Sequence, residues 1–266
     1  MLQLTVFISL VSHGHAQLIA DNRLLQQLAT VDYVEVVIRD NKGSSGLSDL
    51  ADRHGYHYQT SPTPLGFGAN NNAVFDYCRT HLGMQSKDYF CLLNPDLVIQ
   101  SEALLATVDE AKRRQARIVT IDLFQDYDLT QSDLNIKRFP SLLDFAKGFL
   151  LGSNPAAYDK TLITEPVTVD WASGAFLLFR ADLYEQLGGF DERFFMYLED
   201  VDICRRARDQ FDEKLLYLPQ FKAVHLCRQA NKRLFSKHFL WFLTSMLKYF
   251  LKHGWSKPPK KHRTNE

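Results

Sequence analysis

Short apolar runs alternate with helix-length segments through the first 120 residues, and this alternation constrains the fold more than any other feature of the sequence. The strand-like runs lie at residues 3–11, 34–39, 56–59, 89–93 and 117–121, and the helical patterns between them at 16–29, 45–54, 66–82 and 101–114. Strands that alternate with helices form βαβ units and a largely parallel sheet. The sequence therefore predicts an α/β fold.

Polar clusters follow three of these runs, at residues 12–15, 39–41 and 94–96. Ligands of open α/β sheets bind outside the carboxyl ends of the strands, so these clusters are candidate binding residues. No G-x-G-x-x-G follows the first strand, and no G-x-x-x-x-G-K-[ST] occurs in the chain. Neither a dinucleotide-binding fold nor a P-loop is therefore predicted.

The second half of the chain is less regular. Residues 122–168 are interpreted as a variable insert with a helix near 142–151, and a loop and strand follow at 167–180. The four cysteines form no C-x-x-C pair, which predicts reduced, buried thiols: Cys78, Cys91, Cys204 and Cys227.

The formal net charge of zero conceals two regions of opposite sign. Residues 228–266 contain ten of the 31 basic residues and one of the 31 acidic ones, so residues 1–227 carry −9 and the remainder +9. Such a basic segment meets an anionic surface or is only a solvated tail. The N-terminal run lacks a basic n-region and a cleavage site, so we expect the body to stay in the cytoplasm. No nucleic-acid partner is expected.

Residues 234–251 have the length and the i, i+3/i+4 apolar spacing of an amphipathic helix, with lysines between the aromatic residues. Polar residues interrupt the segment too often for a bilayer span, which needs about 20 apolar residues. Two interpretations follow. The helix lies at the interface of an anionic membrane, or it packs on the core of the domain.

Asn94-Pro95-Asp96 ends a buried strand where a ligand would bind. One carboxylate there, together with diphosphate oxygens, is enough to hold Mg²⁺ or Mn²⁺. The alternative is a simple turn, since Asn-Pro-Asp is a common turn sequence.

Glu199, Asp200 and Asp202 stand at a predicted helix start, after an aromatic run. Acidic residues there stabilise a helix N-terminus through its dipole. The functional interpretation is a general base, because burial beside aromatic rings and other carboxylates raises a carboxyl pKa. Asp200 is the predicted base, and Glu199 and Asp202 support it.

Each of the other polar candidates has a functional and a structural interpretation. Asp40 with Asn41 reads the edge of a nucleobase or forms a turn, and His225 is a core residue or a late ligand of a metal or diphosphate. Arg228 and Arg233 contact phosphate or belong to a solvated basic face.

Five motifs in this order resemble family 2 inverting glycosyltransferases of the GT-A fold, over about residues 4–230. They are Arg39-Asp40-Asn41, Gly66-Phe67-Gly68-Ala69-Asn70-Asn71-Asn72, Asn94-Pro95-Asp96, Asp170-Trp171-Ala172-Ser173-Gly174-Ala175, and Gly188-Gly189-Phe190-Asp191 with Tyr197-Leu198-Glu199-Asp200-Val201-Asp202. The residues of these motifs are most similar to those of the bacterial rhamnosyltransferase branch.

The resemblance implies a role for each matching position. The nucleotide and donor would contact Ser12, His13, Asp40, Asn41, Gly68, Asn72, Asn94 and Asp96. The donor sugar and acceptor would contact Trp171, Ser173, Gly174, Asp202, Arg228 and Arg233. Asp96 and His225 would hold the divalent metal, although Cys227-Arg228 follows His225 where many relatives have Gly and Ser.

The implied fold is a Rossmann-like, mostly parallel sheet with flanking helices at 1–230, plus a membrane-associating helix and tail at 231–266. The implied reaction moves L-rhamnose from dTDP-β-L-rhamnose to the N-acetylglucosamine of a polyprenyl-diphosphate acceptor in O-antigen synthesis. The basic segment at 231–263 would hold the enzyme at the cytoplasmic face of the bacterial inner membrane. The alternatives are another donor, UDP-GlcNAc or UDP-Gal, or a non-catalytic nucleotide-binding protein at the membrane.

Overall fold

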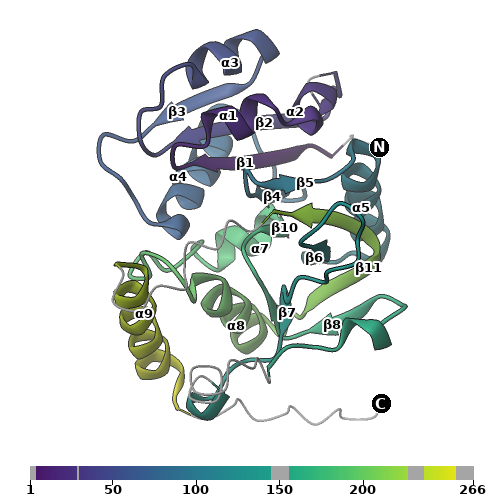
Figure 1. Ribbon diagram of the computed structural model, residues 1–266, viewed down its shortest axis with the longest axis vertical. Helices are drawn as coiled ribbons and strands as arrows, with labels where there is room; N and C mark the ends of the chain where they lie inside the picture. The colour runs from purple at the N-terminus through teal and green to yellow at the C-terminus, as the bar shows by residue number, and fades with distance from the viewer. Residues whose placement is uncertain (1–3, 29, 145–155, 227–236, 256–266) are drawn as a thin grey trace.

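The computed structural model describes residues 4–28, 30–144, 156–226 and 237–255, which form an α/β fold (Figure 1). Its strands are β1 Val6–Ser12, β2 Val34–Asp40, β3 His57–Thr60, β4 Tyr89–Leu93, β5 Leu97–Val98, β6 Ile118–Phe124, β7 Ile136–Lys137, β8 Val167–Val169, β9 Trp171–Ala172, β10 Phe176–Arg180 and β11 Leu215–His225. The helices are α1 Ala16–Ala20, α2 Arg23–Leu28, α3 Leu47–His54, α4 Phe67–His81, α5 Ser101–Arg114, α7 Ala181–Gln186, α8 Glu199–Phe211 and α9 Lys237–His253, with a 3₁₀ turn at Lys160–Leu162.

The main sheet has the strand order β3-β2-β1-β4-β10-β6-β11-β5, and β8 also pairs with β11. The first four strands are parallel, as predicted. Beyond them the sheet is mixed, because β10 runs antiparallel to both β4 and β6. The loop before β10 reaches the edge at which β4 ends, where the Asn94 N–H donates to the Ala175 carbonyl at 3.0 Å. A strand that starts at that edge has to run opposite to β4.

The predicted elements of the first 120 residues are confirmed with two differences, of which one is the short strand β5, which was not predicted. The predicted helix at 16–29 is two helices, α1 and α2. The Asn22 carboxamide oxygen accepts the Leu24 N–H at 3.1 Å and starts the second helix, as an asparagine at a helix start does. Most of the predicted helix at 142–151 lies outside the described residues.

Both faces of the sheet are covered with buried apolar side chains. One cluster joins α4, α7, α8 and α9 and includes Phe75, Tyr184 and Ile203. The other joins α2, α3 and α5 and includes Leu50 and Leu104. Three of the four cysteines are buried and free, as predicted, and Cys227 lies outside the described residues.

Helix α9 packs on the body with one face and leaves the other exposed. Tyr249 and Phe250 are each 1% exposed and belong to the same cluster as α8, beside which α9 lies in Figure 1. The opposite face carries the leucine stripe, which we define as Leu240, Leu243, Leu247 and Leu251. The interpretation that this helix packs on the core of the domain therefore holds for the face that carries Tyr249 and Phe250. Within the described residues, no helix is long and apolar enough to cross a bilayer.

Candidate active site

The carboxyl ends of β1, β2 and β4 meet at one edge of the sheet, as the parallel registers require. Ser12 pairs with Asp40 across β1 and β2. His225, the last residue of β11, reaches this edge from the other side of the sheet. It pairs with Leu97 of β5, which directly follows Asp96. The predicted polar clusters therefore lie along one edge although up to 213 residues separate them in the chain.

Asp96 and His225 lie together at this edge, with a third side chain behind them. His225 Nε2 is 3.6 Å from Asp96 Oδ1, and His225 Nδ1 is 2.9 Å from Asp133 Oδ2. Burial raises the pKa of Asp96, but the hydrogen bond and charge of His225 outweigh that effect and hold this pKa below its usual value. Asp96 is therefore an ionised carboxylate beside a half-enclosed imidazole.

The two side chains fit a divalent ion that is shared with a substrate. Carboxylate oxygen and imidazole nitrogen are both ordinary Mn²⁺ ligands, and the Asp133 hydrogen bond turns the other imidazole nitrogen toward Asp96. In the part of the chain that the structure describes, no group of three or more His, Cys, Asp or Glu side chains is arranged to hold a metal. Diphosphate oxygens would have to supply the remaining ligands, which is how Mg²⁺-type ions are commonly bound.

Asp200 lies in the first turn of α8, and backbone groups hold its carboxylate. Oδ2 accepts the Gly174 N–H at 3.2 Å, and Oδ1 accepts the Val201 N–H at 2.8 Å. The next residue of this loop, Ala175, accepts the Asn94 N–H with its carbonyl. The 173–175 loop therefore connects the candidate base to the turn that carries Asp96.

Two buried polar atoms beside Asp200 have no hydrogen-bond partner. They are Ser173 Oγ and Glu199 Oε2, and Glu199 is 5% exposed. An unsatisfied buried oxygen costs about 1–3 kcal/mol, and a bound ligand or a water molecule that supplies the missing bond removes this cost. Both flank the candidate base, one on each of the segments that meet there.

The Glu199–Asp200 pair has carboxyl pKa values above the ordinary range. Burial is the main cause for both, and the charge of Asp200 raises the pKa of Glu199 further, to well above its usual value. Glu199 holds the proton because one of its oxygens lacks a partner, whereas Asp200 accepts two N–H bonds that favour the ionised form. Asp200 is thus an ionised carboxylate with increased affinity for a proton, which suits a general base.

The corner before α8 has an uncommon backbone conformation. Tyr197 and Leu198 have φ of +70° and +65°, the left-handed region that non-glycine residues rarely adopt. Surrounding structure has to hold such a corner. The Phe195 carbonyl accepts the Phe67 N–H at 3.0 Å, and a Cβ at Gly66 would lie 2.3 Å from that carbonyl oxygen.

Asp202 does not face a ligand, which corrects its predicted place at the donor sugar or acceptor. It is fully buried, and its oxygens bind Arg206 at 2.8 Å and Lys252 and His253 at 2.7 Å each. Burial raises the pKa of Asp202, but the bonds from His253 and the two cations hold it below its usual value. Helix α8 therefore turns Asp202 toward α9.

Asn72 is also corrected, from donor binding to a structural role, whereas donor binding by Gly68 stays a prediction. The Asn72 amide donates to the Phe190 carbonyl at 2.9 Å and to Glu192 at 3.0 Å, and its oxygen accepts from Tyr184 and the Phe190 N–H at 2.8 Å each. These four bonds use its whole capacity. A Cβ at Gly68 would lie 2.6 Å from the Phe190 Cβ. Both residues anchor the Gly188–Glu192 loop against α4.

The two interpretations of Asp40 can be compared directly. It is fully buried, and its oxygens accept from the backbone of residues 42–44 and from Tyr58, as a turn requires. Asn41 bonds Leu65 at 2.8 Å and the His13 ring at 3.0 Å, and the Ser12 hydroxyl accepts the His15 N–H. Asp40 thus shapes the loop beside His13, and recognition of a base stays a prediction. Burial, with the charges of neighbouring groups, lowers the pKa of His13.

The remaining predicted residues are Trp171 of β9 and two arginines near the C-terminus. Trp171 is largely buried on β9, and its indole N–H donates to the Arg138 carbonyl at 2.9 Å. Arg228 and Arg233 lie outside the described residues.

Sequence reasoning missed two functional candidates in the insert and helix α4. Asp133 lies in the irregular 122–168 segment, where no motif marked it. Asn71 is buried, and its side-chain oxygen accepts the Ser9 hydroxyl of β1 at 2.7 Å. The run of three asparagines was the signal for it, since amides are rarely buried without a partner.

Comparison with known proteins identifies the family. The family model for glycosyl transferase family 2 matches residues 20–188. The chain is 34% identical over 245 residues to rhamnosyltransferase WbbL of Escherichia coli K12, covering 92% of each chain. It is 29% identical to an N-acetylglucosaminyl-diphospho-decaprenol L-rhamnosyltransferase of Mycobacterium tuberculosis, covering 74% of this chain and 68% of the relative.

Solved structures support the fold. A crystal structure of GalNAc-T7 with UDP, GalNAc and Mn²⁺ matches with a TM-score of 0.60 at 12% identity, covering 93% of this chain and 48% of that one. The mannosyltransferase PcManGT from Pyrobaculum calidifontis, in complex with GDP-Man and Mn²⁺, matches with a TM-score of 0.56 at 15% identity, covering 96% of this chain and 66% of that one. At these identities the likeness concerns the fold alone.

Proposed function

The chain belongs to glycosyl transferase family 2, and from this we propose that it transfers L-rhamnose from dTDP-β-L-rhamnose to the N-acetylglucosamine of a polyprenyl-diphosphate acceptor. The observation that carries the proposal is Asp200, a carboxylate with a raised pKa beside two unpartnered polar atoms at the ligand edge of the sheet. The names of the two relatives supply the sugar and the lipid-linked acceptor.

In the proposed mechanism Asp200 accepts the proton of an acceptor hydroxyl while that oxygen attacks the anomeric carbon. The dTDP group leaves from the opposite face, so a single displacement inverts the configuration and needs no covalent nucleophile. Glu199, protonated, and the Ser173 hydroxyl donate hydrogen bonds to sugar oxygens, which satisfies both atoms. Ser12, His13, Asp40, Asn41 and Asn94 form the nucleotide side of the site, and Trp171 and Gly174 border the sugar.

We assign a Mg²⁺ or Mn²⁺ ion to Asp96 and His225. When bound, the metal would offset the charge that develops on the departing diphosphate. Asp96 contributes a carboxylate oxygen, and His225 contributes the nitrogen that Asp133 leaves facing Asp96. A carboxylate behind a ligating histidine fixes its tautomer and orientation.

Asp133→Asn is therefore expected to weaken Mn²⁺ binding about 10–100-fold in the presence of dTDP. An asparagine oxygen can still accept the histidine N–H but carries no charge, so the imidazole becomes a poorer ligand. Titration of Mn²⁺ by electron paramagnetic resonance measures this without turnover. Asp126→Asn, at an exposed carboxylate of the same insert, is the matched control, and equal Mn²⁺ affinity of both variants would contradict the assignment.

The donor is tested by a screen of dTDP-rhamnose, UDP-GlcNAc and UDP-Gal against a synthetic lipid-diphosphate-GlcNAc. Transfer from dTDP-rhamnose with inversion is the expected result. Transfer from a UDP sugar alone would replace the donor but keep the family mechanism. Absence of transfer from all three, with nucleotide still bound, would favour the non-catalytic alternative.

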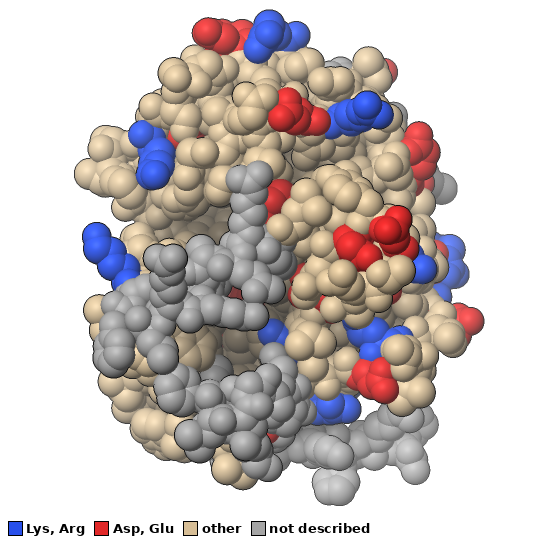
Figure 2. All heavy atoms as spheres, viewed as in Figure 1, with Lys and Arg blue, Asp and Glu red and all other residues tan. Residues whose placement is uncertain are grey.

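We further propose that the enzyme is peripheral to the cytoplasmic face of the bacterial inner membrane and that the leucine stripe of α9 contacts the lipid. The four leucines are 38–69% exposed, and the chain after residue 256 adds four basic residues and one acidic residue. An apolar face with cationic flanks suits an anionic membrane surface. On the face shown in Figure 2, by contrast, basic and acidic side chains are interspersed.

The double substitution of Leu240 and Leu247 by Asp is expected to release the protein from vesicles that contain anionic lipid, because it places charge on the lipid-facing side. Sedimentation with vesicles measures the bound fraction. Leu162→Asp, which alters a leucine that is 80% exposed on a different element, should bind as the unmodified protein does. If the leucine stripe instead joins two copies of the chain, the double substitution would dissociate a dimer in the absence of vesicles.

A further inference from the structure

We propose that helix α9 positions the catalytic carboxylate: Lys252 and His253, acting through Asp202, fix the turn of α8 from which Asp200 extends. This inference rests on the proposed role of Asp200 as the base. It gives the C-terminal helix a part in catalysis that is separate from membrane contact.

The connection starts at the buried Asp202 carboxylate. Lys252 Nζ and His253 Nε2 both bind its Oδ1 at 2.7 Å, and Asp202 is two residues from Asp200 on the same helical turn. Removing one partner of a buried charge leaves the other uncompensated, so the remaining groups rearrange or admit water. Any such movement is passed to Asp200 through one turn of backbone.

Other contacts from α9 follow the segment that leads into this turn. The Ser245 hydroxyl donates to the Met196 carbonyl at 2.8 Å, and the Tyr197 hydroxyl lies 2.9 Å from His238 Nδ1. The Phe195 and Trp241 rings are 4.8 Å apart between centroids. Helix α9 therefore covers the left-handed corner along its length, which is the support that an unfavourable backbone conformation needs.

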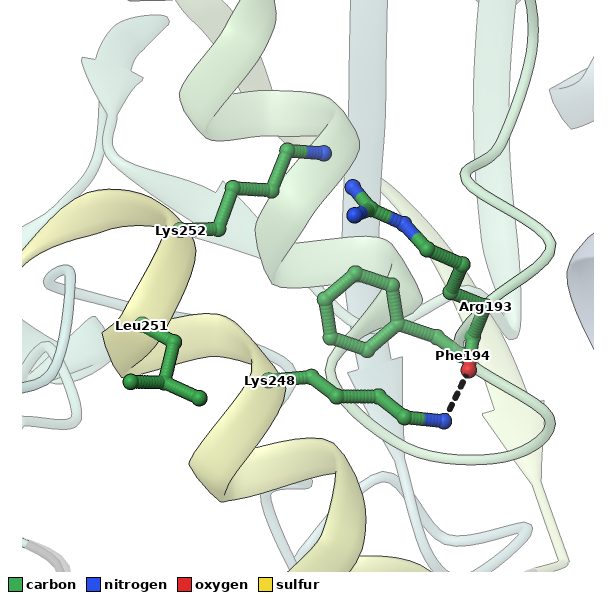
Figure 3. Close-up of a pocket in the computed structure, with 5 residues that line it drawn as sticks. All are labelled: Arg193, Phe194, Lys248, Leu251 and Lys252. Carbon is green, nitrogen blue, oxygen red and sulfur yellow. Dashed lines mark hydrogen bonds between the residues drawn. The ribbon is translucent and has the colours of Figure 1, made fainter.

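The seam between α9 and this segment contains a cavity of about 370 Å³, lined by Arg193, Phe194, Lys248, Leu251 and Lys252 (Figure 3). Lys248 donates to the Arg193 carbonyl at its edge. Arg193 and Lys252 are both paired with Asp191, so two of the three cations already have a carboxylate partner. We therefore interpret the seam as part of the support of the corner, with room for α9 to shift, and not as a ligand site.

Asp200 depends on this support because two backbone N–H groups hold its carboxylate, from Gly174 and Val201. Such bonds orient the carboxylate only while the two backbone segments keep their separation. A misplacement of about 1 Å at a catalytic group can cost 10²-fold in rate. The distance between the 173–175 loop and α8 is thus the quantity that α9 controls.

The test is Lys252→Met, assayed with a short-chain, water-soluble acceptor so that membrane binding does not contribute. We expect kcat to fall about tenfold with an unchanged KM for the donor, since the base and not the donor site is displaced. Lys252→Arg keeps the charge at the same place and should restore most of kcat. His253→Gln serves as the second variant if Lys252→Met is poorly folded, and it should show the same division between kcat and KM.

Amide hydrogen exchange of residues 193–202 supplies a measurement that does not depend on the substrate. Exchange should accelerate in Lys252→Met and stay unchanged in Lys237→Met, which removes the same charge from an exposed position on α9. Unchanged kcat, or a change confined to KM, would overturn the inference even if exchange accelerates. Accelerated exchange in a protein that transfers no sugar at all would refute the proposed function while the contact between α9 and the corner stands.

Discussion

Asp200→Asn is expected to lower kcat by about 10³-fold and to leave the Kd of the donor nucleotide unchanged. The substitution keeps the size of the side chain, and the single amide oxygen can accept the N–H of either Gly174 or Val201, the two groups that bind separate oxygens of Asp200. It removes the capacity to take the acceptor proton and one of the two backbone hydrogen bonds, while the donor nucleotide site is unchanged. Single-turnover transfer and nucleotide titration separate the two quantities.

Glu199→Gln is the matched control for this experiment. Because burial keeps Glu199 protonated, glutamine preserves both its neutral charge and its ability to donate, so kcat near neutral pH should fall far less than in Asp200→Asn. If Glu199→Gln were the inactive variant and Asp200→Asn the active one, the two carboxylates would have exchanged roles.

The same carboxylate sets the acid limb of the pH profile. Burial raises the pKa of Asp200 above its usual value, and the base works only when it is ionised. The kcat should therefore be lost as the pH falls through this raised pKa, at a higher pH than an exposed aspartate would give. Since Glu199 and Asp200 share a site, the limb reports the pair and not one residue.

Arg206→Met is expected to destabilise the fold by about 3–5 kcal/mol, because it leaves a buried carboxylate with one cation fewer. Arg206 is 8% exposed and its partner Asp202 is fully buried. The guanidinium also donates to the Leu187 and Gly189 carbonyls at 2.6 and 2.7 Å, which the variant leaves unpaired. For a chain of this size the loss corresponds to a fall in Tm of roughly 10 °C.

Thermal unfolding followed by circular dichroism measures this change. Arg113→Met removes an arginine whose ion pair with Glu110 lies on the exposed face of α5, and it should leave Tm unchanged because exposed pairs contribute little. Equal Tm values for the two variants would mean that the Asp202 pair lends no stability to α8.

The sequence predicted the parallel half of the sheet and its ligand edge because both depend on local patterns. An apolar run followed by polar residues identifies the end of a strand, and the carboxyl ends of parallel strands share one edge. The antiparallel course of β10 was not predictable in this way. It follows from the edge at which the chain re-enters the sheet, where Asn94 is bonded to Ala175, 81 residues further along the sequence.

The candidate site shows the same division. Asp96 and Asp200 were found because each belongs to a short motif at an element boundary. Asp202 belongs to the same motif as Asp200, yet it faces α9, because it binds Lys252 and His253, which lie 50 and 51 residues further along the chain. Asp133 was not predicted because only its hydrogen bond to His225, 92 residues further along the chain, makes it a functional candidate.

The pairing of Asp202 with His253 also bears on when the enzyme becomes competent during its synthesis. Strands β1 to β10 and helix α8 are complete once residue 211 has been made, and domains generally fold as their chain emerges. Lys252 and His253 are among the last described residues, so until they emerge the Asp202 carboxylate has only Arg206 as an ion-pair partner. A chain halted between residues 226 and 252 would therefore have every strand of its sheet but not the two α9 side chains that bind Asp202, and we expect it to bind a nucleotide without transferring sugar.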